Sequence, residues 1–390
     1  MPATLQGGAP KDPAEMADLS QPLADLSHPE ASAPTITPHD PSPAGDVRED
    51  PLVRAGSGAG DAELYVDQMI DEYQITGKLG KGGMGTVYAG IQPVIGKRVA
   101  VKVLLRQYAS DPRVVNRFVQ EARAVNQARS RFIVDIFSFG TLADGRHYFV
   151  MEHIDGRSLR EYLKDRGVLE FDEAHAILTA VARGLGAAHA KGIVHRDLKP
   201  ENIIVVEEDG RPSAKILDFG IAKLVGPDEN SSEPGFATQT GTAMGTPYYM
   251  SPEQVRGSAV DHRTDVYALG IIVFEMFTGA LPFDAQSYID LVNKHLFAAP
   301  PRPSEISKSV PPELEGLILR CIAKDPDARP QSMEEFLREL DGISPQLRGT
   351  RFSLTGPGSR PRIAPPMGAT AAQRPLAKGR GEAADGAAGA

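Results

Sequence analysis

The sequence of 390 residues predicts an α+β fold, in which a small strand-rich N-terminal lobe precedes a larger, mostly helical C-terminal lobe. Apolar and polar residues alternate with the period of a β-strand between residues 73 and 151, whereas apolar residues recur at helical spacing after Gly156. Hydrophobic residues make up 41% of the chain and charged residues 24%, and this balance is typical of a globular protein.

The strands of the first lobe are expected in the runs YQITGKLG, TVYAGIQ, RVAVKVLL, FIVDIFSFG and HYFVMEHI. A helix is expected between the third and fourth runs, because Asp111 is a candidate N-cap and Pro112 suits the first helical position. Phe118, Ala122 and Val125 then recur at helical spacing, so we expect these three side chains to face the core.

The second lobe is expected to contain helices in FDEAHAILTAVARGLGAAHAKG, DVYALGIIVFEMFTG, ELEGLILRCIAK and MEEFLREL. The segment from Tyr267 to Leu281 is strongly apolar, but it contains Glu275 and is shorter than a bilayer requires, so it indicates a buried core helix. The strands IIVV and AKIL, joined through EEDGRPS, interrupt the helical pattern and are expected to form a hairpin.

The two ends of the chain differ from its middle in composition. Residues 1–70 are rich in Pro, Ala, Asp and Ser, and residues 343–390 are basic, so we expect both segments to be disordered. A solvated linker is favoured over a docking or phosphorylated tail for the C-terminal segment. The net charge of −9 argues against a nucleic-acid partner, and Cys321, the single cysteine, excludes an intrachain disulfide. With neither a secretory signal nor an apolar membrane span in the sequence, a cytoplasmic protein is expected.

A glycine-rich segment, Gly80-Lys81-Gly82-Gly83-Met84-Gly85, lies between two expected strands. Glycines let backbone N–H groups approach phosphate oxygens closely, although a plain glycine-rich turn would give the same pattern. The segment leads into a strand and lacks a Gly-Lys-Ser/Thr ending, which argues against a dinucleotide-binding turn and against a P-loop. It therefore suggests a flap over a nucleotide.

Lys102 lies on an expected strand, on the same face as Ala100 and Leu104. An unpaired ammonium in apolar surroundings is costly, so Lys102 is expected to need anionic partners. Between Val103 and Ser130 the acidic residues are Asp111 and Glu121, and Asp111 already serves as the helix cap. Glu121 is the expected counter-ion, with a surface lysine and a surface glutamate as the alternative.

The segment His195-Arg196-Asp197-Leu198-Lys199-Pro200-Glu201-Asn202 carries the strongest chemical signal. Pro200 disfavours helix, so the segment is expected to form a loop that directs three polar side chains, Asp197, Lys199 and Asn202, toward one point. A carboxylate can accept a proton from a hydroxyl nucleophile, an ammonium can neutralise a transferring phosphoryl group, and an amide oxygen can bind Mg²⁺. His195 is expected to be a packed core histidine.

Asp218-Phe219-Gly220 follows the strand AKIL, where the carboxylate can hold a magnesium ion and the glycine permits a sharp turn. Together with the preceding motifs, and in the same order, it resembles the eukaryotic-type (Hanks-type) protein kinases over residues 73 to 341. The chain resembles soluble bacterial members of this family in the runs GGMGTVY and GTPYYMSPEQ and in its lack of Trp. The resemblance implies a bilobal protein kinase fold, with an N-lobe of antiparallel sheet and one main helix at 73–151 and a helical C-lobe at 155–341.

The same resemblance implies ATP and Mg²⁺ as cofactors, with Mn²⁺ as an alternative metal. Asp197 is then the catalytic base, Lys199 steadies the γ-phosphate, Lys102 pairs with Glu121, and Asn202 and Asp218 hold the metal. The backbone of Glu152 and Ile154 is expected to bind adenine. The implied nucleotide site comprises Leu79, Gly80, Lys81, Gly82, Gly83, Gly85, Val87, Ala100, Lys102, Met151, Glu152, Ile154, Asn202, Ile204, Leu217 and Asp218.

Three further positions resemble structural parts of the family. Glu253 of Ser251-Pro252-Glu253 is expected to pair with Arg329, and Asp265 to anchor the backbone of the 195–202 loop. Lys199, two residues after Asp197, and the segment GTPYY at 245–249 resemble serine/threonine kinases more than tyrosine kinases. The implied function is transfer of phosphate from ATP to Ser or Thr of proteins in signal transduction.

The stretch from Asp218 to Glu253 is the expected regulatory segment. It contains Thr238, Thr240 and Thr242, and Arg196 offers a cation for a phosphate on this segment. Autophosphorylation in trans is therefore expected at Thr238 or Thr240, with Thr242 third, through a transient homodimer, and ordinary polar loop residues are the alternative. Thr246 is expected to have a structural, substrate-contacting role.

Other classes of function fit these residues less well or only in addition. A nucleotide-binding pseudokinase would be expected to lack Lys102, Asp197, Asn202 or Asp218, and all four are present. A small-molecule kinase would not need the 218–253 segment or Arg329. A kinase that acts mainly as an interaction hub through its terminal segments is compatible with activity. Substrate, activating signal and oligomeric state cannot be read from the sequence.

Overall fold

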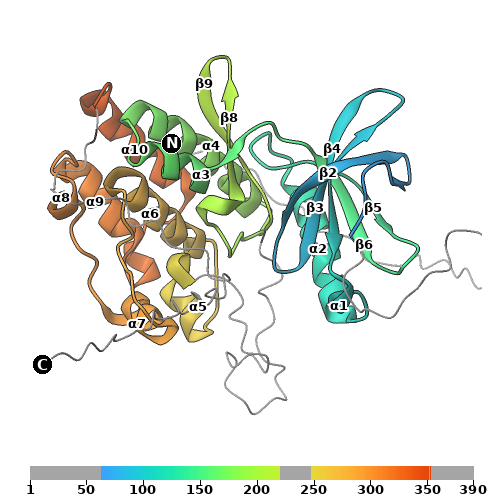
Figure 1. Cartoon of the computed structure of the whole chain (residues 1–390). Coiled ribbons are helices and arrows are strands. Elements are labelled where there is room, and N and C mark those ends of the chain that lie inside the picture. Colours follow the sequence, from blue (N-terminus) through green and yellow to red (C-terminus); the bar gives the residue numbers. More distant parts are fainter. Residues whose placement is uncertain (1–62, 220–246, 351, 353–390) are drawn as a thin grey trace, which may run out of the picture. The chain divides into compact units, whose positions relative to one another are not determined.

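The chain divides into two units, residues 1–59 and 60–390. The computed structural model describes residues 63–219, 247–350 and 352, all of which lie in the second unit. Within this unit a lobe built on a sheet precedes a mostly helical lobe, as Figure 1 shows in the colour order from blue to red. The predicted α+β, two-lobed fold is therefore confirmed.

The first lobe is an antiparallel sheet in the order β1-β2-β3-β4-β6-β5. Its strands are β1 (Met69–Ile70), β2 (Tyr73–Lys81), β3 (Gly85–Gln92), β4 (Lys97–Leu104), β5 (Ile136–Thr141) and β6 (His147–Glu152). In this register Val87 lies opposite Lys102, and Ala100 lies opposite Met151. The central strand β4 thus brings together residues from both neighbouring strands.

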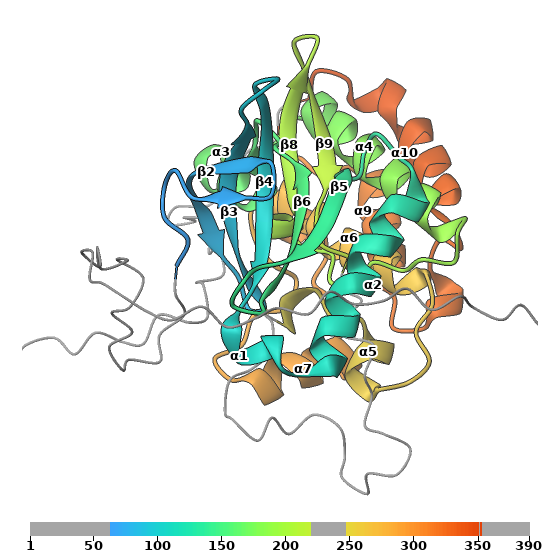
Figure 2. The same ribbon diagram turned by 90° about the vertical axis from the view of Figure 1, so that its right-hand side faces the viewer.

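Helix α2 (Pro112–Ala128) packs against this sheet and follows the short helix α1 (Arg106–Ala109) (Figure 2). The N-cap predicted from the sequence is confirmed, because Asp111 accepts a hydrogen bond from the backbone N–H of Arg113 at 2.9 Å. Phe118, Ala122 and Val125 are buried, also as predicted. Because this face of α2 is buried against the sheet, the orientation of the helix is fixed, and Glu121 of α2 contacts Lys102 of β4.

The second lobe contains helices α3 to α10 and short 3₁₀ turns. The helices are α3 (Leu159–Arg166), α4 (Phe171–His189), α5 (Pro252–Arg256), α6 (Arg263–Thr278), α7 (Tyr288–Phe297), α8 (Pro303–Ile306), α9 (Pro312–Cys321) and α10 (Met333–Leu347). The turns are η1 (Pro200–Asn202), η3 (Pro247–Tyr249) and η4 (Pro326–Ala328). A small sheet in the order β7-β8-β9 joins β7 (Arg157–Ser158), β8 (Ile203–Glu208) and β9 (Arg211–Ile216).

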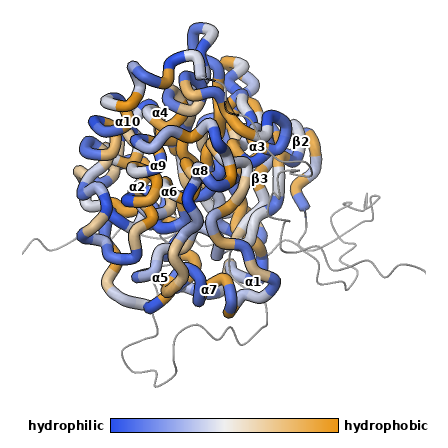
Figure 3. The backbone as a smooth tube through the Cα atoms, turned by 90° about the vertical axis from the view of Figure 1, so that its left-hand side faces the viewer, coloured by the Kyte–Doolittle hydropathy of each residue, from blue (hydrophilic) through white to orange (hydrophobic). Residues whose placement is uncertain are grey.

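Helix α6 forms the centre of this lobe, as its apolar sequence predicts. Every residue from Thr264 to Thr278 is buried, including Glu275. Figure 3 shows hydrophobic residues gathered around α6 and α9. Across the described residues, no helix combines the length and the apolar character needed to span a bilayer.

Strands β8 and β9 form the predicted hairpin, but with a much shorter connection than the expected EEDGRPS loop. Asp209 and Gly210 alone form the turn, with φ of 52° and 72° respectively. Positive φ at both central positions is the turn geometry that matches the twist of paired strands, and Asp and Gly tolerate it. The polar residues on either side therefore continue the strands.

Folded structure extends past both expected domain boundaries. At the N-terminal end Leu64 and Ile70 are buried in a small cluster on the first lobe, although the composition of residues 1–70 predicts disorder. At the C-terminal end α10 runs through Leu347, and the buried Phe352 packs on Phe277 with ring centroids 4.9 Å apart. Each of these apolar side chains finds a core to bury against, which composition alone does not reveal.

Candidate active site

The β8–β9 hairpin positions two of the predicted site residues. Asn202 ends the turn before β8 and Asp218 follows β9, and Ile203 lies opposite Ile216 where the two strands close. The backbone N–H of Leu217 also donates to the carbonyl of Asn202 at 2.8 Å. Asn202 and Asp218 are therefore held at the same end of the hairpin.

The loop from His195 to Asn202 is anchored by Asp265 of α6. The Asp265 carboxylate accepts hydrogen bonds from the backbone N–H groups of His195 at 2.8 Å and Arg196 at 2.9 Å, which confirms the predicted anchor. Burial alone would raise the pKa of Asp265, but a 2.7 Å hydrogen bond to His189, with these backbone contacts, holds the pKa below its usual value. The anchor therefore stays ionised at neutral pH.

His195 is a core histidine, as predicted. Its side chain is fully buried, its Nε2 lies 3.0 Å from the carbonyl oxygen of Leu217, and its ring packs on Phe219. Burial lowers its pKa, so the imidazole is neutral at physiological pH. It joins the 195–202 loop to the segment that carries Asp218.

The three polar residues of the loop lie together. The ammonium of Lys199 is 2.7 Å from a carboxylate oxygen of Asp197, and the amide nitrogen of Asn202 donates to the carbonyl of Asp197 at 2.9 Å. Arg196 and Asp218 both have positive φ, 64° and 42°, a conformation that costs energy in residues other than glycine. Such strain is typical of functional segments that the surrounding fold holds in place.

Lys102 is buried and contacts two carboxylates. Its ammonium is 3.0 Å from Glu121 of α2, the predicted counter-ion, and 2.8 Å from Asp218. The contact with Asp218 was not anticipated, because no local pattern indicates that the segment after β9 reaches β4. The site thus contains one positive and two negative charges, of which Lys102 and Glu121 are buried and Asp218 is 40% exposed.

Burial and the neighbouring charges together determine the ionisation of the cluster. Burial opposes the charge on Lys102, but Asp218 and Glu121 outweigh it and raise its pKa. Burial, with a smaller contribution from Asp218, raises the pKa of Glu121 to about 7 despite the attraction of Lys102. Lys102 therefore stays protonated, whereas Glu121 is the member that takes up a proton near neutral pH.

The glycines of the β2–β3 segment fall into two groups. A Cβ on Gly85 would lie 2.6 Å from the carbonyl oxygen of Val103, so this glycine is required for β3 to pack on β4. A Cβ on Gly80 or Gly83 would meet no atom within 4 Å, and one on Gly82 would meet only the Gly85 carbonyl at 3.8 Å. No neighbouring atom therefore requires a glycine at these three positions, although Gly80 pairs with Val87 and the N–H of Gly82 donates to the Gly85 carbonyl at 2.8 Å.

Most of the apolar residues expected to receive a base belong to the larger core cluster or pack against it. Ala100 and Met151 are buried in the larger core, and Val87, Ile154 and Leu217 are half-buried against it. Ile204 is half-buried on β8, and Leu79 is exposed on β2. At the end of β6, the carboxylate of Glu152 is held by the ammonium of Lys215 at 2.5 Å.

Further down the second lobe, the predicted ion pair between Glu253 and Arg329 is confirmed. Two nitrogens of Arg329 lie 2.8 and 2.9 Å from the two carboxylate oxygens, and both residues are buried. Burial would raise the pKa of Glu253, but Arg329 and the hydroxyl of Thr264 lower it. The neighbouring Gln254 donates to the carbonyl of Arg196 at 2.8 Å, which ties this segment to the 195–202 loop.

One polar cluster escaped the sequence analysis. The guanidinium of Arg160, on α3, contacts the carboxylates of Glu201 at 2.9 Å and Glu275 at 2.5 Å and the hydroxyl of Tyr249. The signal that could have found it is Glu275, an acid in the apolar stretch of α6 after Asp265, because a buried carboxylate requires a cationic partner.

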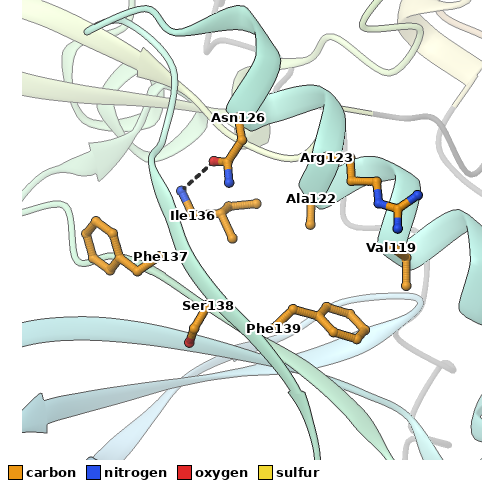
Figure 4. Close-up of a pocket in the computed structure, with 8 residues that line it drawn as sticks. All are labelled: Val119, Ala122, Arg123, Asn126, Ile136, Phe137, Ser138 and Phe139. Carbon is orange, nitrogen blue, oxygen red and sulfur yellow. Dashed lines mark hydrogen bonds between the residues drawn. The ribbon is translucent and has the colours of Figure 1, made fainter.

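Another group of residues lines a pocket of about 310 Å³ between α2 and β5, drawn in Figure 4. It is lined by Val119, Ala122, Arg123, Asn126, Ile136, Phe137, Ser138 and Phe139. None of the predicted site residues lines this pocket, so it is distinct from the polar cluster around Lys102 and Asp197. Gly220, Thr238, Thr240, Thr242 and Thr246 lie outside the described residues.

The donor set suits a hard cation that is also bound by phosphate. Among the described residues no group of three or more His, Cys, Asp and Glu side chains is placed to hold a metal alone. Asp218 has a 40% exposed side chain, and the amide nitrogen of Asn202 is already used, which leaves its oxygen as a ligand. Magnesium typically takes one or two protein carboxylates together with phosphate oxygens and water, so these residues fit it.

Comparison with known proteins gives one consistent family. The protein kinase domain family matches residues 73–339. The chain is 39% identical over 292 residues to the serine/threonine-protein kinase Pkn3 of Myxococcus xanthus, which covers 74% of this chain and 53% of that protein. It is 37% identical over 301 residues to the serine/threonine-protein kinase PknL of Mycobacterium tuberculosis, covering 77% of this chain and 72% of that protein.

Solved structures give the same result. The crystal structure of the Mycobacterium tuberculosis PknI kinase domain matches with a TM-score of 0.55 and 28% identity, over 72% of this chain and 99% of that one. The chain spans about half the length of the relatives Pkn3 and Pkn1 of Myxococcus xanthus, at 53% and 48%. The match to PknI covers nearly the whole of that kinase domain.

Proposed function

Because this chain belongs to the protein kinase family, with Hanks-type serine/threonine kinases of bacteria among its relatives, we propose that it transfers the γ-phosphate of ATP to serine and threonine hydroxyls of proteins. The observation that carries the proposal is the meeting of Lys102, Glu121 and Asp218 in one buried cluster. These residues come from three separate segments, and phosphoryl transfer is the chemistry that uses such a set.

In this proposal Asp197 orients the acceptor hydroxyl and takes its proton. Lys199, 2.7 Å from Asp197, supplies positive charge beside the transferring group. Lys102 holds the phosphates of the nucleotide, and Glu121 fixes the position of Lys102. The segment that carries Gly80, Gly82 and Gly83, which has space beside each glycine Cα, covers the phosphates, and the apolar cluster around Ala100 and Met151 receives the adenine.

Asp218 and Asn202 would hold Mg²⁺, and Mn²⁺ can replace it as another hard cation with oxygen ligands. When bound, the metal neutralises charge on the phosphates. Asn202 is kept in place by its hydrogen bond to Asp197, and Asp218 by its contact with Lys102. The two ligands are therefore preorganised by the residues that act beside them.

Two features support a serine or threonine of a protein, and not a small molecule, as the acceptor. Lys199 stands two residues after Asp197, where it reaches the carboxylate directly. The segment from η3 to α5 is fixed to the loop through Gln254 and to the lobe through Glu253, so it can support an extended peptide next to Asp197. A small-molecule acceptor would not require this supported segment.

The test is phosphate transfer from Mg-ATP to a generic protein substrate by wild type and by Asp197→Asn. We expect the variant to lose at least about 100-fold in kcat while it retains nucleotide binding. Asp155→Asn is the matched control, because Asp155 is 73% exposed and pairs with Arg98 at the surface. Equal rates for wild type and Asp197→Asn would overturn the proposal.

We further propose that the kinase phosphorylates its own Thr238 or Thr240, and less readily Thr242, in trans. Support comes from Arg196, whose buried Nε has no hydrogen-bond partner among the described residues, so a phosphate oxygen would satisfy it. Incubation of tagged Asp197→Asn protein with active wild type should place phosphate on these threonines of the inactive copy. Mass spectrometry that finds phosphate only on the active copy would contradict transfer between molecules.

Transfer between copies requires a transient homodimer, and ATP as phosphate donor is consistent with a cytoplasmic location. Sedimentation at increasing protein concentration tests the dimer, and fractionation of cells that express the chain tests the location. A stable monomer whose rate of autophosphorylation per molecule does not depend on concentration would argue against the dimer.

A further inference from the structure

An arginine of the chain itself, Arg160, lies between two carboxylates beside the 195–202 loop. Arg160 of α3 is only 13% exposed in its side chain, and its guanidinium spans Glu201 on η1 and Glu275 on α6. Glu201 is 47% exposed and lies at the surface, whereas Glu275 is 5% exposed and lies beneath. The guanidinium therefore lies between one carboxylate at the surface and one beneath it, and we call the space bounded by Glu201, Glu275 and Tyr249 the acidic recess.

The recess adjoins the site that the acceptor peptide has to reach. Glu201 belongs to the same loop as Asp197 and Lys199, directly before Asn202. Its third wall is Tyr249, whose hydroxyl donates to Glu275 at 2.7 Å and which ends η3, in the segment tied to the loop through Gln254. The guanidinium thus fills a space between the catalytic loop and the segment proposed to support the peptide.

The charges show what this space would otherwise bind. Two carboxylates converge on one guanidinium. Burial and the two carboxylates raise the pKa of Tyr249 well above its ordinary value against the opposing effect of Arg160, so the tyrosine stays un-ionised. Without Arg160 the recess would hold two buried or half-buried negative charges and no cation. A planar guanidinium can hydrogen-bond to both carboxylates at once, whereas a lysine ammonium would bind such a site more weakly.

We propose that Arg160 determines substrate specificity by occupying, from within the chain, a subsite that would otherwise bind a basic side chain of the substrate near the acceptor hydroxyl. The wild type therefore gains little from an arginine at that place in a peptide. This proposal rests on the proposed kinase function, and it adds a reason why the acidic residues of this loop do not select basic substrates.

The experiment compares two peptides that differ only by arginine or alanine on the N-terminal side of a single serine, with the arginine placed at each of four positions in turn. The measured quantity is the ratio of kcat/KM for the two peptides. In Arg160→Met we expect the ratio to rise about tenfold or more relative to wild type at one position, since a charge-assisted contact of this kind is worth at least that factor. In the double variant with Glu201→Gln the rise should disappear.

Arg157→Met is the matched control, because Arg157 lies near Arg160 in the sequence but pairs with the exposed Asp165 at 2.6 Å. It removes the same charge without opening the recess, so its ratio should stay within about twofold of wild type. An unchanged ratio in active, folded Arg160→Met would overturn the proposal, and so would a rise that persists without Glu201.

Should Arg160→Met fail to fold, Glu201→Gln in the wild-type background decides the question. The proposal expects an unchanged peptide ratio, because Arg160 already neutralises Glu201. A fall of about fivefold or more would mean that Glu201 reads the substrate directly, and the proposal would be wrong. Absence of phosphate transfer by wild type to every peptide would instead count against the proposed function, so the two failures are distinct.

Discussion

Asp218 lies 2.8 Å from the ammonium of Lys102, so a residue just after β9 contacts the middle of β4 in the other lobe. This contact and the 3.0 Å contact with Glu121 make Lys102 the point at which α2, β4 and the segment after β9 meet. The relationship connects the position of a helix in one lobe to the position of a carboxylate in the other.

Removing the ammonium should abolish this connection. For Lys102→Met we expect kcat/KM to fall by about 100-fold or more, because preorganised charge at the transferring phosphate typically contributes that much. Steady-state kinetics with a generic protein substrate measures the loss. Lys78→Met, at a lysine of β2 that is 38% exposed and pairs with Glu63, is the control and should retain full activity.

The pH dependence of stability should reveal the unusual ionisation of Glu121. Burial raises its pKa to about 7, so between its ordinary value and pH 7 the folded state binds a proton that the unfolded state has released. The contribution of Glu121 to stability is therefore largest at low pH and is lost as the pH rises through about 7. Because a glutamine side chain does not ionise, Glu121→Gln should not lose this stability as the pH rises.

We expect the free energy of unfolding of Glu121→Gln, relative to wild type, to increase by about 2 kcal/mol between about pH 5 and pH 8. Its kinase activity should nevertheless fall, because a neutral amide positions Lys102 less well. Urea unfolding at both pH values provides the measurement. A relative stability that stays constant between about pH 5 and pH 8 would show that Glu121 is instead held ionised by Lys102.

The glycine-rich segment should separate packing from ligand contact. Gly85→Ala places a Cβ 2.6 Å from the Val103 carbonyl, so we expect it to lower the free energy of unfolding by about 1–3 kcal/mol. Gly83→Ala meets no atom within 4 Å and should leave stability within about 0.5 kcal/mol of wild type. Thermal unfolding without nucleotide compares the two variants.

Gly83→Ala, which should barely change stability, should change nucleotide binding. Gly83→Ala is expected to weaken ATP binding severalfold, because its methyl group and its narrower backbone freedom restrict the segment over the phosphates. Isothermal titration with Mg-ATP measures the affinity. Full affinity in Gly83→Ala would mean that this backbone does not approach the phosphates.

The buried pair of Glu253 and Arg329 should support the substrate-facing segment. Glu253→Ala leaves the guanidinium of Arg329 buried without its carboxylate, and we expect a loss of about 3–5 kcal/mol in stability. Denaturant unfolding of both single variants and the double variant gives the coupling between the two residues. Single losses that simply add in the double variant would show that the two residues do not act as a pair.

Much of this site could be predicted from the sequence because its parts are local. The N-cap at Asp111 and the anchor at Asp265 rest on short motifs, and the pairing of Lys102 with Glu121 follows from the scarcity of acids on the intervening helix. The N-cap and the Lys102–Glu121 pair lie within short stretches of chain, whereas the Asp265 anchor, 70 residues from His195, was expected from the resemblance to a known family.

The parts that sequence reasoning missed depend on tertiary contacts. The approach of Asp218 to Lys102 requires the hairpin β8–β9 to reach the other lobe, and the Arg160 cluster joins α3, η1, η3 and α6. The folded limits at Leu64 and Phe352 likewise depend on cores formed by residues far away in the chain. Neither hydrophobic periodicity nor a local motif predicts contacts between residues that lie so far apart in the sequence.

The central claim is that Lys102, Asp197 and Asp218 act around one Mg-nucleotide. Its most direct test is phosphoamino-acid analysis of purified protein incubated with γ-labelled ATP and Mg²⁺ together with a protein substrate. We expect label on serine or threonine with the wild type and none with Asp197→Asn or Asp218→Asn. Wild type that binds Mg-ATP but labels no hydroxyl of any polypeptide, including its own, would contradict it.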